Sequence, residues 1–513
     1  MGGRDPPNLR RGGRPFGLRP RIRHWPMRSD ISNRWIRALF LRGVGLVYLV
    51  AFLSLIPQIT GLIGEHGILP VHDYLDAIQS QFGGTGYRVF PTLAWLNSSD
   101  AFLRLLCWTG ASMGAALFVG ILPLPAAIVL YILYLSIDTA GQTFLSFQWD
   151  ALLLEAGFAA ILLAPWGVRP RYTEEPSRIA LWVPRLLAFR LMLESGAVKL
   201  LSGDPTWRNL TALNFHYETQ PLPTPLAWYA HHLPASFQKF SVGTMFVIEL
   251  AVPFLFLMPR RLRIIGAWTT IVFQMLIAAT GNYTFFNLLT IVLCLTLFDD
   301  RHVEGFLPAR LRLAVANSNR SRPRVRIWQW ICAGAGGILI VIGLAQLLTV
   351  VGAFQSLPEP LTSINERIEI FHIVNHYGLF AVMTTSRPEI FIEGSNDGQE
   401  WKMYEFKFKP GDIGRTPRWV APFHPRLDWQ MWFAALSSYR DNPWFSMLVR
   451  RLLEGSGDVL ALFQNNPFPD KPPRFIRATV YDYHFSDYAT RRGTGAWWTR
   501  QYLGSYFPAA SLR

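Results

Sequence analysis

The sequence predicts a membrane all-α bundle of about nine transmembrane helices, followed by an extramembrane α+β domain with a β-sandwich-like sheet. Half of the 513 residues are hydrophobic and only 16% are charged, whereas soluble domains carry about a quarter charged residues. Uncharged runs long enough to cross a bilayer recur up to residue 354, and polar turns with strand-like segments follow. We therefore divide the chain into a basic segment 1–35, a transmembrane region 36–354 and a C-terminal domain 355–513.

The net charge of +15 is concentrated at the N-terminus. Residues 1–42 hold eleven arginines against only Asp5 and Asp30, which supplies +9 of the total. A basic leader directly before an apolar segment marks the cytoplasmic side of a membrane more often than a nucleic-acid site. We expect the lipid bilayer, and no nucleic acid, as the partner of this region.

The predicted spans follow from the length of the apolar runs, because a helix needs about 20 such residues to cross the hydrocarbon. One of them, 180–202, is apolar but carries four charged residues. The run Leu105–Ile137 contains one span and the start of a second, and the run Ile264–Phe298 contains two spans. The nine spans come from Gly43–Gly64, Leu105–Ile137, 151–168, 180–202, 240–258, Ile264–Phe298 and Ile327–Phe354.

The distribution of arginines predicts the orientation of these spans. With residues 1–42 in the cytoplasm, the outside connections 65–104 and 203–238 are poor in Lys and Arg. The connections that land inside contain Arg169, Arg171, Arg178, Arg260, Arg261, Arg263, Arg310, Arg312, Arg320, Arg322, Arg324 and Arg326. This satisfies the positive-inside rule. An odd number of spans then places the C-terminal domain in the periplasm or lumen.

The C-terminal domain combines strand-like and helix-like segments. Ser395-Asn396-Asp397-Gly398 predicts a tight turn between two strands, because Asn, Asp and Gly tolerate positive φ. The predicted strands are Glu366–His372, Glu389–Gly394, Glu400–Phe408 and Phe475–Phe485, and the predicted helices are Asp428–Ser438 and Trp444–Leu453.

Ionisable residues within the spans form a predicted polar network. Each costs roughly 2.5–3.5 kcal/mol on insertion scales, so such residues face the bundle interior and find partners. Arg190 and Glu194 lie four residues apart and share a helix face, whereas Lys199 lies on another face, so other helices must supply acids. The network comprises Asp150, Glu155, Arg190, Glu194, Lys199 and Glu249. A purely structural network and a functional cavity that opens to the non-cytoplasmic side both remain open.

The sequence lacks the short motifs of common enzymes and metal sites. It contains no Gly-x-Ser-x-Gly, His-Glu-x-x-His, Cys-x-x-Cys or Walker loop, so we expect no cofactor and no catalytic residue of these classes. His216, Glu218, His231 and His232 lack a recognised ligand spacing, so we expect no metal. Gly110-x-x-x-Gly114 and Gly334–Gly337 predict close helix packing.

The aromatic segment after residue 427 has two interpretations. Buried, its side chains form a core, which the sequence favours; partly exposed, they form a surface that binds a client protein. The residues concerned are Asp428, Trp429, Gln430, Trp432 and Phe433.

From about residue 35 to the C-terminus the chain resembles the lipase maturation factor family. The segments that carry the resemblance are Gln148–Gly157, Thr280–Leu289, Arg426–Leu436, Asn466–Pro469 and Gly495–Trp498. The resemblance implies a membrane-embedded factor that helps secreted clients, by analogy homodimeric lipases, to mature, and that is not itself a lipase. It implies the endoplasmic reticulum membrane in a eukaryote and the inner membrane in a bacterium, with the C-terminal domain luminal or periplasmic.

A second, local resemblance supports an alternative. Ser195-Gly196-Ala197-Val198-Lys199-Leu200, followed by Trp207, is similar to a segment of the vitamin K-dependent carboxylase membrane domain. This resemblance implies an intramembrane enzyme in which Lys199 acts as a base beside Glu194 and Arg190. A desolvated lysine can serve as a base, but nearby acids would hold it charged.

Overall fold

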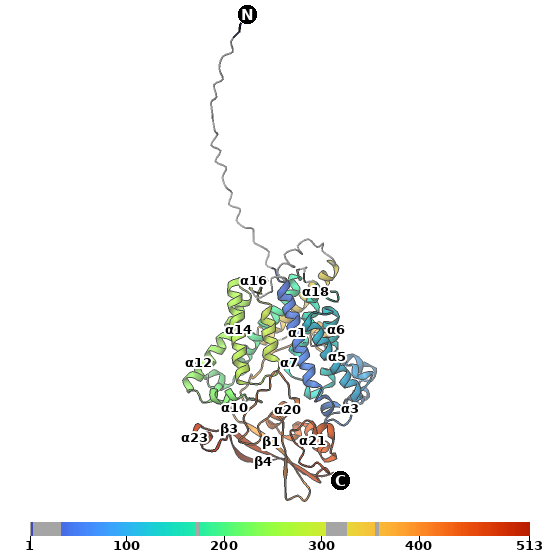
Figure 1. Cartoon of the computed structure of the whole chain (residues 1–513), viewed down its shortest axis with the longest axis vertical. Coiled ribbons are helices and arrows are strands. Elements are labelled where there is room, and N and C mark those ends of the chain that lie inside the picture. The colour runs from blue at the N-terminus through green and yellow to red at the C-terminus, as the bar shows by residue number, and fades with distance from the viewer. Residues whose placement is uncertain are drawn as a thin grey trace.

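A computed structural model describes residues 2–3, 32–170, 172, 175–303, 326–353, 356 and 359–512. Most of the predicted segment 1–35 and the arginines Arg171, Arg310, Arg312, Arg320, Arg322 and Arg324 lie outside the described residues. The chain forms a helical bundle, and a C-terminal domain covers one end of it (Figure 1). The start of α1 and helix α16 lie at the opposite end.

Nine helical segments occupy the positions predicted for the spans. They are α1 Arg34–Leu55, α5 Asp100–Val119, α6 Pro123–Ala140, α7 Gln148–Leu163, α8 Arg178–Leu201, α12–α13 Ala235–Phe256, α14 Arg260–Thr280, α15 Phe286–Leu295 and α18 Arg326–Val350. Six helices in the described part are long and apolar enough to cross a membrane. The exceptions are α7 with 16 residues, α15 with 10 and α8 with its buried charges. Most residues of these three helices are buried against other parts of the protein.

Local sequence signals set the ends of several spans. Ser99 caps α5, which ends at Gly120 with φ +83°, a left-handed conformation that glycine adopts without steric cost. The first turn of α1 is capped from far away in the chain: the Asp300 carboxylate accepts the backbone N–H groups of Arg34 and Trp35 at 2.8 and 3.0 Å. Asp300 belongs to α16 Asp300–Val303, so this short helix, which follows α15, is joined to the start of α1.

Glycines allow α1 and α5 to approach closely. A Cβ on Gly114 would lie 2.7 Å from the backbone nitrogen of Leu49, and one on Gly110 would meet the Phe52 ring at 2.5 Å. The predicted packing role of these two glycines is therefore confirmed. In the predicted run Gly334–Gly337, a Cβ on Gly336 would lie 3.2 Å from Val183 of α8, so close packing is confirmed there. The prediction is wrong for Gly334 and Gly337, where a Cβ would meet no atom of the described residues within 4 Å.

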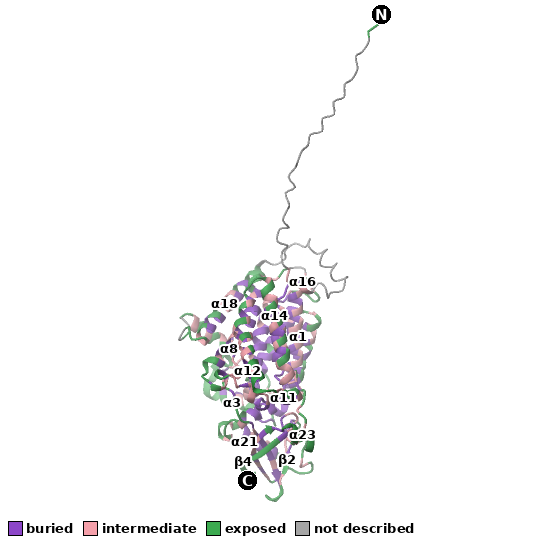
Figure 2. Cartoon of the chain, turned by 90° about the vertical axis from the view of Figure 1, so that its left-hand side faces the viewer, coloured by how far each residue is buried: buried purple, intermediate pink, exposed green. Residues whose placement is uncertain are grey.

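Short helices fill the two long connections on the side of the C-terminal domain. They are α2 Ile59–Ile63, α3 Val71–Phe82 and α4 Gly86–Val89 in the first, and α9 Pro205–Arg208, α10 Leu213–Thr219 and α11 Pro225–His231 in the second. Buried residues continue from the bundle through these connections into the domain (Figure 2). The two parts therefore share one continuous core.

The C-terminal domain is α+β, with a single four-stranded antiparallel sheet in the order β2-β1-β3-β4. Its elements are α19 Leu361–Glu369, β1 Pro388–Ser395, β2 Lys402–Tyr404, α20 Arg426–Ala435, α21 Pro443–Glu454, α22 Gly457–Leu460, β3 Phe475–Phe485, α23 Tyr488–Thr494 and β4 Trp498–Ala510. The strand predicted at Phe475–Phe485 and the turn at Gly398, with φ +75°, are confirmed.

Two predictions for this domain are wrong. The segment Glu366–His372 is not a strand, because Leu361, Ile364 and Ile368 give the preceding residues a helical period that produces α19. The sheet is not part of a sandwich in the described residues. Helices cover one face of the sheet, where Phe445 of α21 packs on Phe507 with 5.7 Å between ring centres. On the other face, Trp228 of α11 packs in an aromatic cluster with Phe391, Tyr483, Phe485 and Trp498.

Candidate functional site: the junction of bundle and C-terminal domain

Helix α20 lies between the sheet and the end of the bundle (Figure 1). The first residue of α20, Arg426, forms the most completely buried ion pair between the two parts. Its guanidinium donates to both carboxylate oxygens of Asp150 at 2.6 and 2.8 Å, and the two side chains are fully buried. Tyr134 donates to the same carboxylate at 2.5 Å. A buried carboxylate of the bundle is thus neutralised by a residue of the domain.

A second ion-pair cluster lies deeper in the bundle. Arg190 bonds to Glu155 at 3.0 Å and to Glu194 at 3.1 Å, which confirms the predicted pairing along α8. The segment after α19 enters the bundle to complete this cluster. Glu155 accepts the Tyr377 hydroxyl at 2.7 Å, and Glu194 accepts the Tyr377 backbone N–H at 2.9 Å. Two acids are therefore balanced by one arginine and by hydrogen bonds from the C-terminal part of the chain.

A third pair joins two bundle helices. Lys199 of α8 donates to both carboxylate oxygens of Glu249 at 2.8 and 3.0 Å. Glu249 lies in a π-helical turn, Val247–Ala251, which interrupts α12–α13. The Lys199 ammonium also lies 5.6 Å from the centre of the Trp207 ring.

The predicted polar network is therefore divided into three separate ion-pair groups. Asp150 does not pair with a charge of α8, because its partner Arg426 lies 276 residues away in the sequence and in the other domain. Glu155 and Glu249 do pair with α8, through Arg190 and Lys199. This division separates charges that hold the domain in place from a charge pair internal to the bundle.

The predicted client-binding segment supplies much of the packing at the junction. Trp429 packs on Trp149 at 4.7 Å between ring centres, and Trp432 donates its indole N–H to the Thr219 carbonyl at 2.8 Å. Asp428, Trp429, Gln430 and Trp432 are all buried, whereas Phe433 is 43% exposed. The core interpretation thus fits four of the five residues, and direct contact with a client stays a prediction for Phe433.

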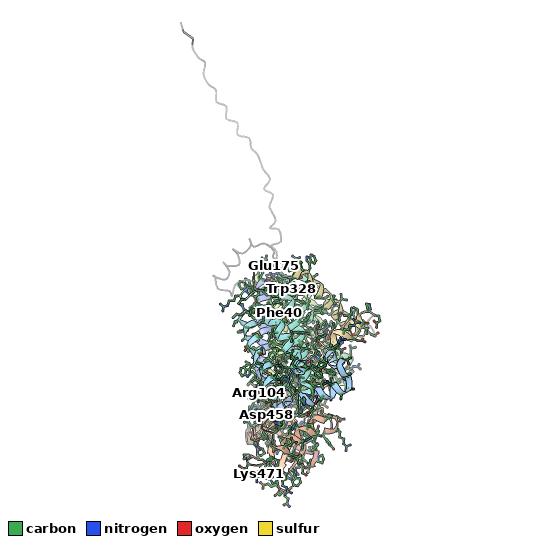
Figure 3. All side chains as sticks on the ribbon, turned by 90° about the vertical axis from the view of Figure 1, so that its right-hand side faces the viewer. Phe40, Arg104, Glu175, Trp328, Asp458 and Lys471 are labelled. Atoms are coloured by element: carbon green, nitrogen blue, oxygen red, sulfur yellow. The ribbon has the colours of Figure 1, made fainter. Side chains whose placement is uncertain are left out.

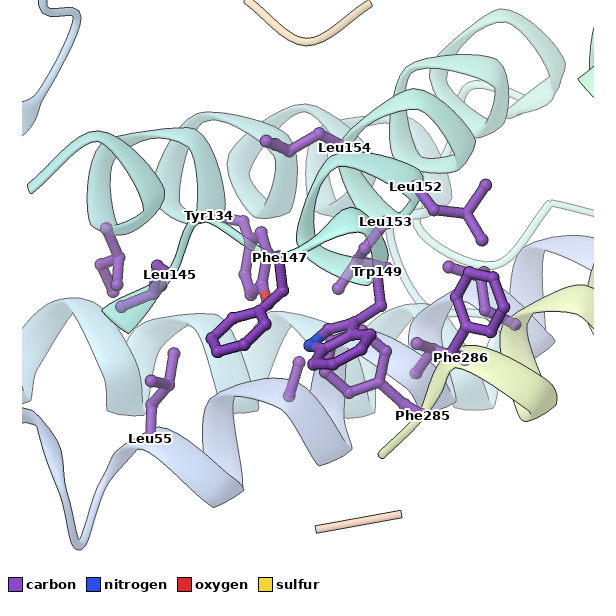
Figure 4. Close-up of a cluster of buried hydrophobic side chains, with 14 of the residues drawn as sticks. Leu55, Tyr134, Leu145, Phe147, Trp149, Leu152, Leu153, Leu154, Phe285 and Phe286 are labelled. Atoms are coloured by element: carbon purple, nitrogen blue, oxygen red, sulfur yellow. The ribbon is translucent and has the colours of Figure 1, made fainter. Parts of the chain in front are cut away.

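The aromatic cluster at the junction extends into the bundle. Figure 4 shows Phe147 and Trp149 side by side, and their rings stack at 4.8 Å. Trp149 donates to Nδ1 of His424 at 3.2 Å. Burial, together with the charge of Arg426, lowers the pKa of His424 well below its usual range, so this imidazole is neutral. Both these aromatic rings and the charged Arg426 side chain at the junction are therefore buried from solvent.

Arg387 makes a further set of contacts between the domain and the connection that joins α8 to α12. It bonds to Glu389 at 2.8 Å and donates to the carbonyl of Pro221 at 2.9 Å, and also to those of Glu218 and Gln220. At the edge of this contact His484 of β3 lies 3.3 Å from the Glu218 carboxylate. Figure 3 places Arg104 of the bundle near Asp458 of the domain at the other side, and these side chains are 3.5 Å apart.

Asn282 joins three segments with one side-chain amide. It accepts the backbone N–H groups of Val420 and Ala421 at 2.7 and 2.9 Å and donates to the carbonyls of Leu222 and Arg418 at 3.1 and 2.8 Å. His216, Glu218, His231 and His232 lie near this region, but the described residues contain no group of three or more ligands that could hold a metal ion. Here too the polar groups position backbone segments of both domains.

Two family models match the chain over most of its described length. The model of the lipase maturation factor transmembrane domain matches residues 35–305, and that of the lipase maturation factor C-terminal domain matches residues 373–508. The chain belongs to the lipase maturation factor family. The chicken protein named lipase maturation factor 2 is 39% identical, with 93% of this chain and 81% of the relative covered.

Two human members of the lipase maturation factor family are similar over comparable lengths. Human lipase maturation factor 2 is 37% identical over 94% of this chain and 83% of its own length. Human lipase maturation factor 1 is 37% identical over 95% of this chain and 90% of its own length. No solved structure matches the chain. Together with the six apolar helices, the family membership establishes an integral membrane protein.

The sequence did not predict which residues of the C-terminal part bond to the buried polar groups of the bundle in this member of the lipase maturation factor family. Arg426, Arg387, Asn375 and Tyr377 were not predicted as site residues, although Arg426 opens one of the segments that carry the family resemblance. Arginine is rarely fully buried unless it is paired, so a buried Arg426 requires an acidic partner. Its partner, however, is only evident from the fold.

Proposed function

We propose that this chain is a membrane-embedded maturation factor that assists secreted client proteins, with lipases as the client class named in its relatives. The membership in the lipase maturation factor family and the similarity across more than nine-tenths of the chain support this proposal. The chain acts in folding or assembly, as a chaperone does, and is not itself the lipase.

The topology of the proposal has nine spans. Helices α7, α8 and α15 cross the membrane together with the six apolar helices, so the chain leaves the bundle on the side opposite to the start of α1. The domain boundaries are 1–35, 36–354 and 355–513, with the first segment cytoplasmic and the last periplasmic or luminal. The membrane is the endoplasmic reticulum in a eukaryotic cell or the inner membrane in a bacterium.

The observation that carries the proposal is the Asp150–Arg426 pair. Two fully buried side chains joined by two short hydrogen bonds hold α20 against the bundle, so the sheet keeps a fixed position relative to the membrane. A factor that receives secreted proteins as they fold needs such a rigid non-cytoplasmic surface close to the membrane. The three buried charge groups then serve the architecture that presents this surface.

The alternative intramembrane enzyme finds no support. A base needs a neutral amine with a free lone pair, but both carboxylate oxygens of Glu249 accept from the Lys199 ammonium. Glu194 and Arg190 bond to each other and not to Lys199. We assign Lys199 to the structure of the bundle.

The function is tested by expression of the chain with a secreted homodimeric lipase in cells that lack their own maturation factor. We expect active lipase in the medium only when the chain is present, with lipase mRNA and total lipase unchanged. Equal secretion of active lipase with and without the chain would overturn the proposal.

The orientation is tested by labelling cysteines with a membrane-impermeant maleimide. The three native cysteines are buried, so an introduced cysteine dominates the signal. We expect Lys471→Cys, at the far end of the domain (Figure 3), to be labelled in intact cells or sealed vesicles of known sidedness, and Arg261→Cys to be labelled only after permeabilisation.

A further inference from the structure

Strand β4 forms one edge of the four-stranded sheet. It runs for 13 residues and pairs with β3, and in the described part of the chain no strand pairs with its outer side. The opposite edge, β2, has only three residues. An exposed edge strand presents a row of backbone N–H and C=O groups that can pair with another extended chain.

The register identifies which backbone groups point outward. Tyr483 donates its N–H to the Arg387 carbonyl, so it faces β1, and the neighbouring residues Asp482 and His484 face β4. Their partners are Gln501 and Thr499, which therefore face β3. By alternation, the N–H and C=O groups of Trp498, Arg500 and Tyr502 point away from the sheet.

The protein itself pairs backbone with the start of this edge. Ile413, in the loop before α20, accepts the N–H of Trp498 at 3.1 Å from the outer side. Beyond that contact the amides of Arg500 and Tyr502 meet no acceptor among the described residues. The side chains of Tyr502 and the next residue, Leu503, are 57% and 56% exposed. Beyond the contact with Ile413, the outer edge of β4 therefore has backbone groups that are unpaired within the described part of the chain, over the length of a short strand.

The rest of β4 is protected by its own geometry. The pairing with β3 is regular from Trp498 to Tyr502, but its register shifts three times beyond Tyr502. Bulges twist an edge away from incoming strands, and Pro508 removes one donor from the same part. The open stretch is therefore confined to Arg500 and the residues just after it.

We propose that the outer edge of β4 at Arg500–Leu503 binds an extended segment of an incompletely folded client polypeptide by strand addition. Main-chain hydrogen bonds supply the affinity, and Tyr502 and Leu503 contact apolar side chains of the added strand. An unpaired strand is a feature of a protein before it folds, so this mode selects immature clients over mature ones. The inference rests on the proposed function, whose client it describes.

The test uses the full-length protein in lipid nanodiscs and a fluorescent peptide of alternating threonine and valine with lysine ends. The control peptide is N-methylated at alternate residues and cannot donate to a sheet edge. We expect binding of the first peptide only. Amide exchange should be fast at Arg500 and Tyr502 in the free protein and slow with the peptide, while Thr499 and Gln501 are slow in both states.

Backbone and side-chain variants separate the proposed mode from simple apolar contact. Tyr502→Pro removes an outward donor and should weaken the peptide roughly tenfold, whereas Tyr502→Thr keeps the donor and should change affinity less than about threefold. Arg500→Pro provides a second backbone variant, should Tyr502→Pro unfold the domain. Equal binding by the two peptides, or no change in exchange at Arg500 and Tyr502, overturns the proposal.

Two further outcomes distinguish this proposal from others. If the protein shows a doubled mass that Tyr502→Pro abolishes, and it binds no peptide, then the partner of β4 is a second copy of the chain and not a client. In the lipase secretion assay, full activity of a folded Tyr502→Pro variant overturns strand addition but leaves the proposed function intact. If the wild-type chain has no effect on lipase secretion, the proposed function fails, but peptide binding at β4 can still be measured independently.

Discussion

Asp150 and Glu249 are both buried acids of the bundle, but they bond to partners in different parts of the molecule. Asp150 pairs with Arg426 of the C-terminal domain, whereas Glu249 pairs with Lys199 on a neighbouring bundle helix. The first pair links two domains, and the second links two helices of one domain. Buried charge in this bundle therefore does not indicate one site: it serves the junction in one place and the bundle in another.

The largest expected effect comes from breaking the pair between the domains. Arg426→Met leaves the Asp150 carboxylate buried without its counter-charge, and removal of one partner of a buried pair costs about 3–5 kcal/mol. We expect a lower unfolding temperature and faster proteolytic release of the C-terminal domain from the membrane-bound chain. Both are measured on the purified full-length protein.

The matched control for Arg426→Met removes both charges. Asp150→Leu combined with Arg426→Met replaces the pair by apolar side chains, which restores much of the stability if the charge imbalance caused the loss. If the double variant is as unstable as Arg426→Met, the shape of the arginine and not its charge holds the junction.

The pair inside the bundle should have a smaller effect. Lys199→Met leaves the buried Glu249 without its counter-charge. The cost should lie near or below the lower end of the about 3–5 kcal/mol for a buried pair, because these side chains keep 7% and 8% exposure whereas the Arg426–Asp150 pair is fully buried. We expect a lower unfolding temperature with the C-terminal domain still docked, and lipase secretion that falls only as far as folding does. Lys199→Met with Glu249→Leu should restore both.

The same pair of variants tests the catalytic alternative. If Lys199→Met and the double variant both fold like the wild type but abolish lipase maturation, Lys199 has a chemical role that the ion pair does not explain. Secretion restored in the double variant instead assigns the lysine to structure alone.

The sequence predicted the features that depend on neighbouring residues. The strand Phe475–Phe485, the turn at Gly398 and the pair Arg190–Glu194 all follow from local spacing, and the structure has them. The family resemblance is also confirmed, because it rests on long ordered segments in both halves of the chain. Hydropathy found the six apolar helices for the same local reason.

The sequence could not predict which distant segments meet. Asp150 and Arg426 are 276 residues apart, and nothing in either local pattern identifies the other as its partner. The β-branched and aromatic residues of Glu366–His372 predict a strand, but the helical period that begins at Leu361 dominates. Trp429 and Trp432 could be core or surface, because aromatic residues are common in both.

Helix α20 offers a smaller and more selective comparison between a buried and an exposed aromatic residue. Trp432→Phe removes the indole N–H bonded to the Thr219 carbonyl, which costs about 1–3 kcal/mol because a buried acceptor is left unpaired. Phe433→Ser changes an exposed side chain and should alter stability by less than about 0.5 kcal/mol. Thermal unfolding of the two variants measures the difference.

Lipase secretion with these variants tests the client-binding prediction for Phe433. We expect Phe433→Ser to reduce secretion of active lipase although the protein is as stable as the wild type. Unchanged secretion would assign the whole of α20 to the junction and remove Phe433 from the client surface.

The smallest expected effect is the pH dependence at the edge of the junction. Burial opposes protonation of His484, but Glu218 and Asp482 at 3.3 and 3.2 Å raise its pKa above the ordinary 6.5. A raised pKa stabilises the protonated folded state, so this contribution is present below the ordinary pKa and is lost as the pH rises through the raised one. His231 also faces Glu218, but burial lowers its pKa, so it adds little charge in this range.

We expect docking of the domain, measured by proteolytic release, to weaken from slightly acidic to alkaline pH, and to lose this dependence in His484→Gln. A pH dependence that persists in His484→Gln would place the titrating group elsewhere in the junction. Since half of the His484 side chain is exposed, solvent screens the interaction, and the effect should be far smaller than that of the buried Arg426.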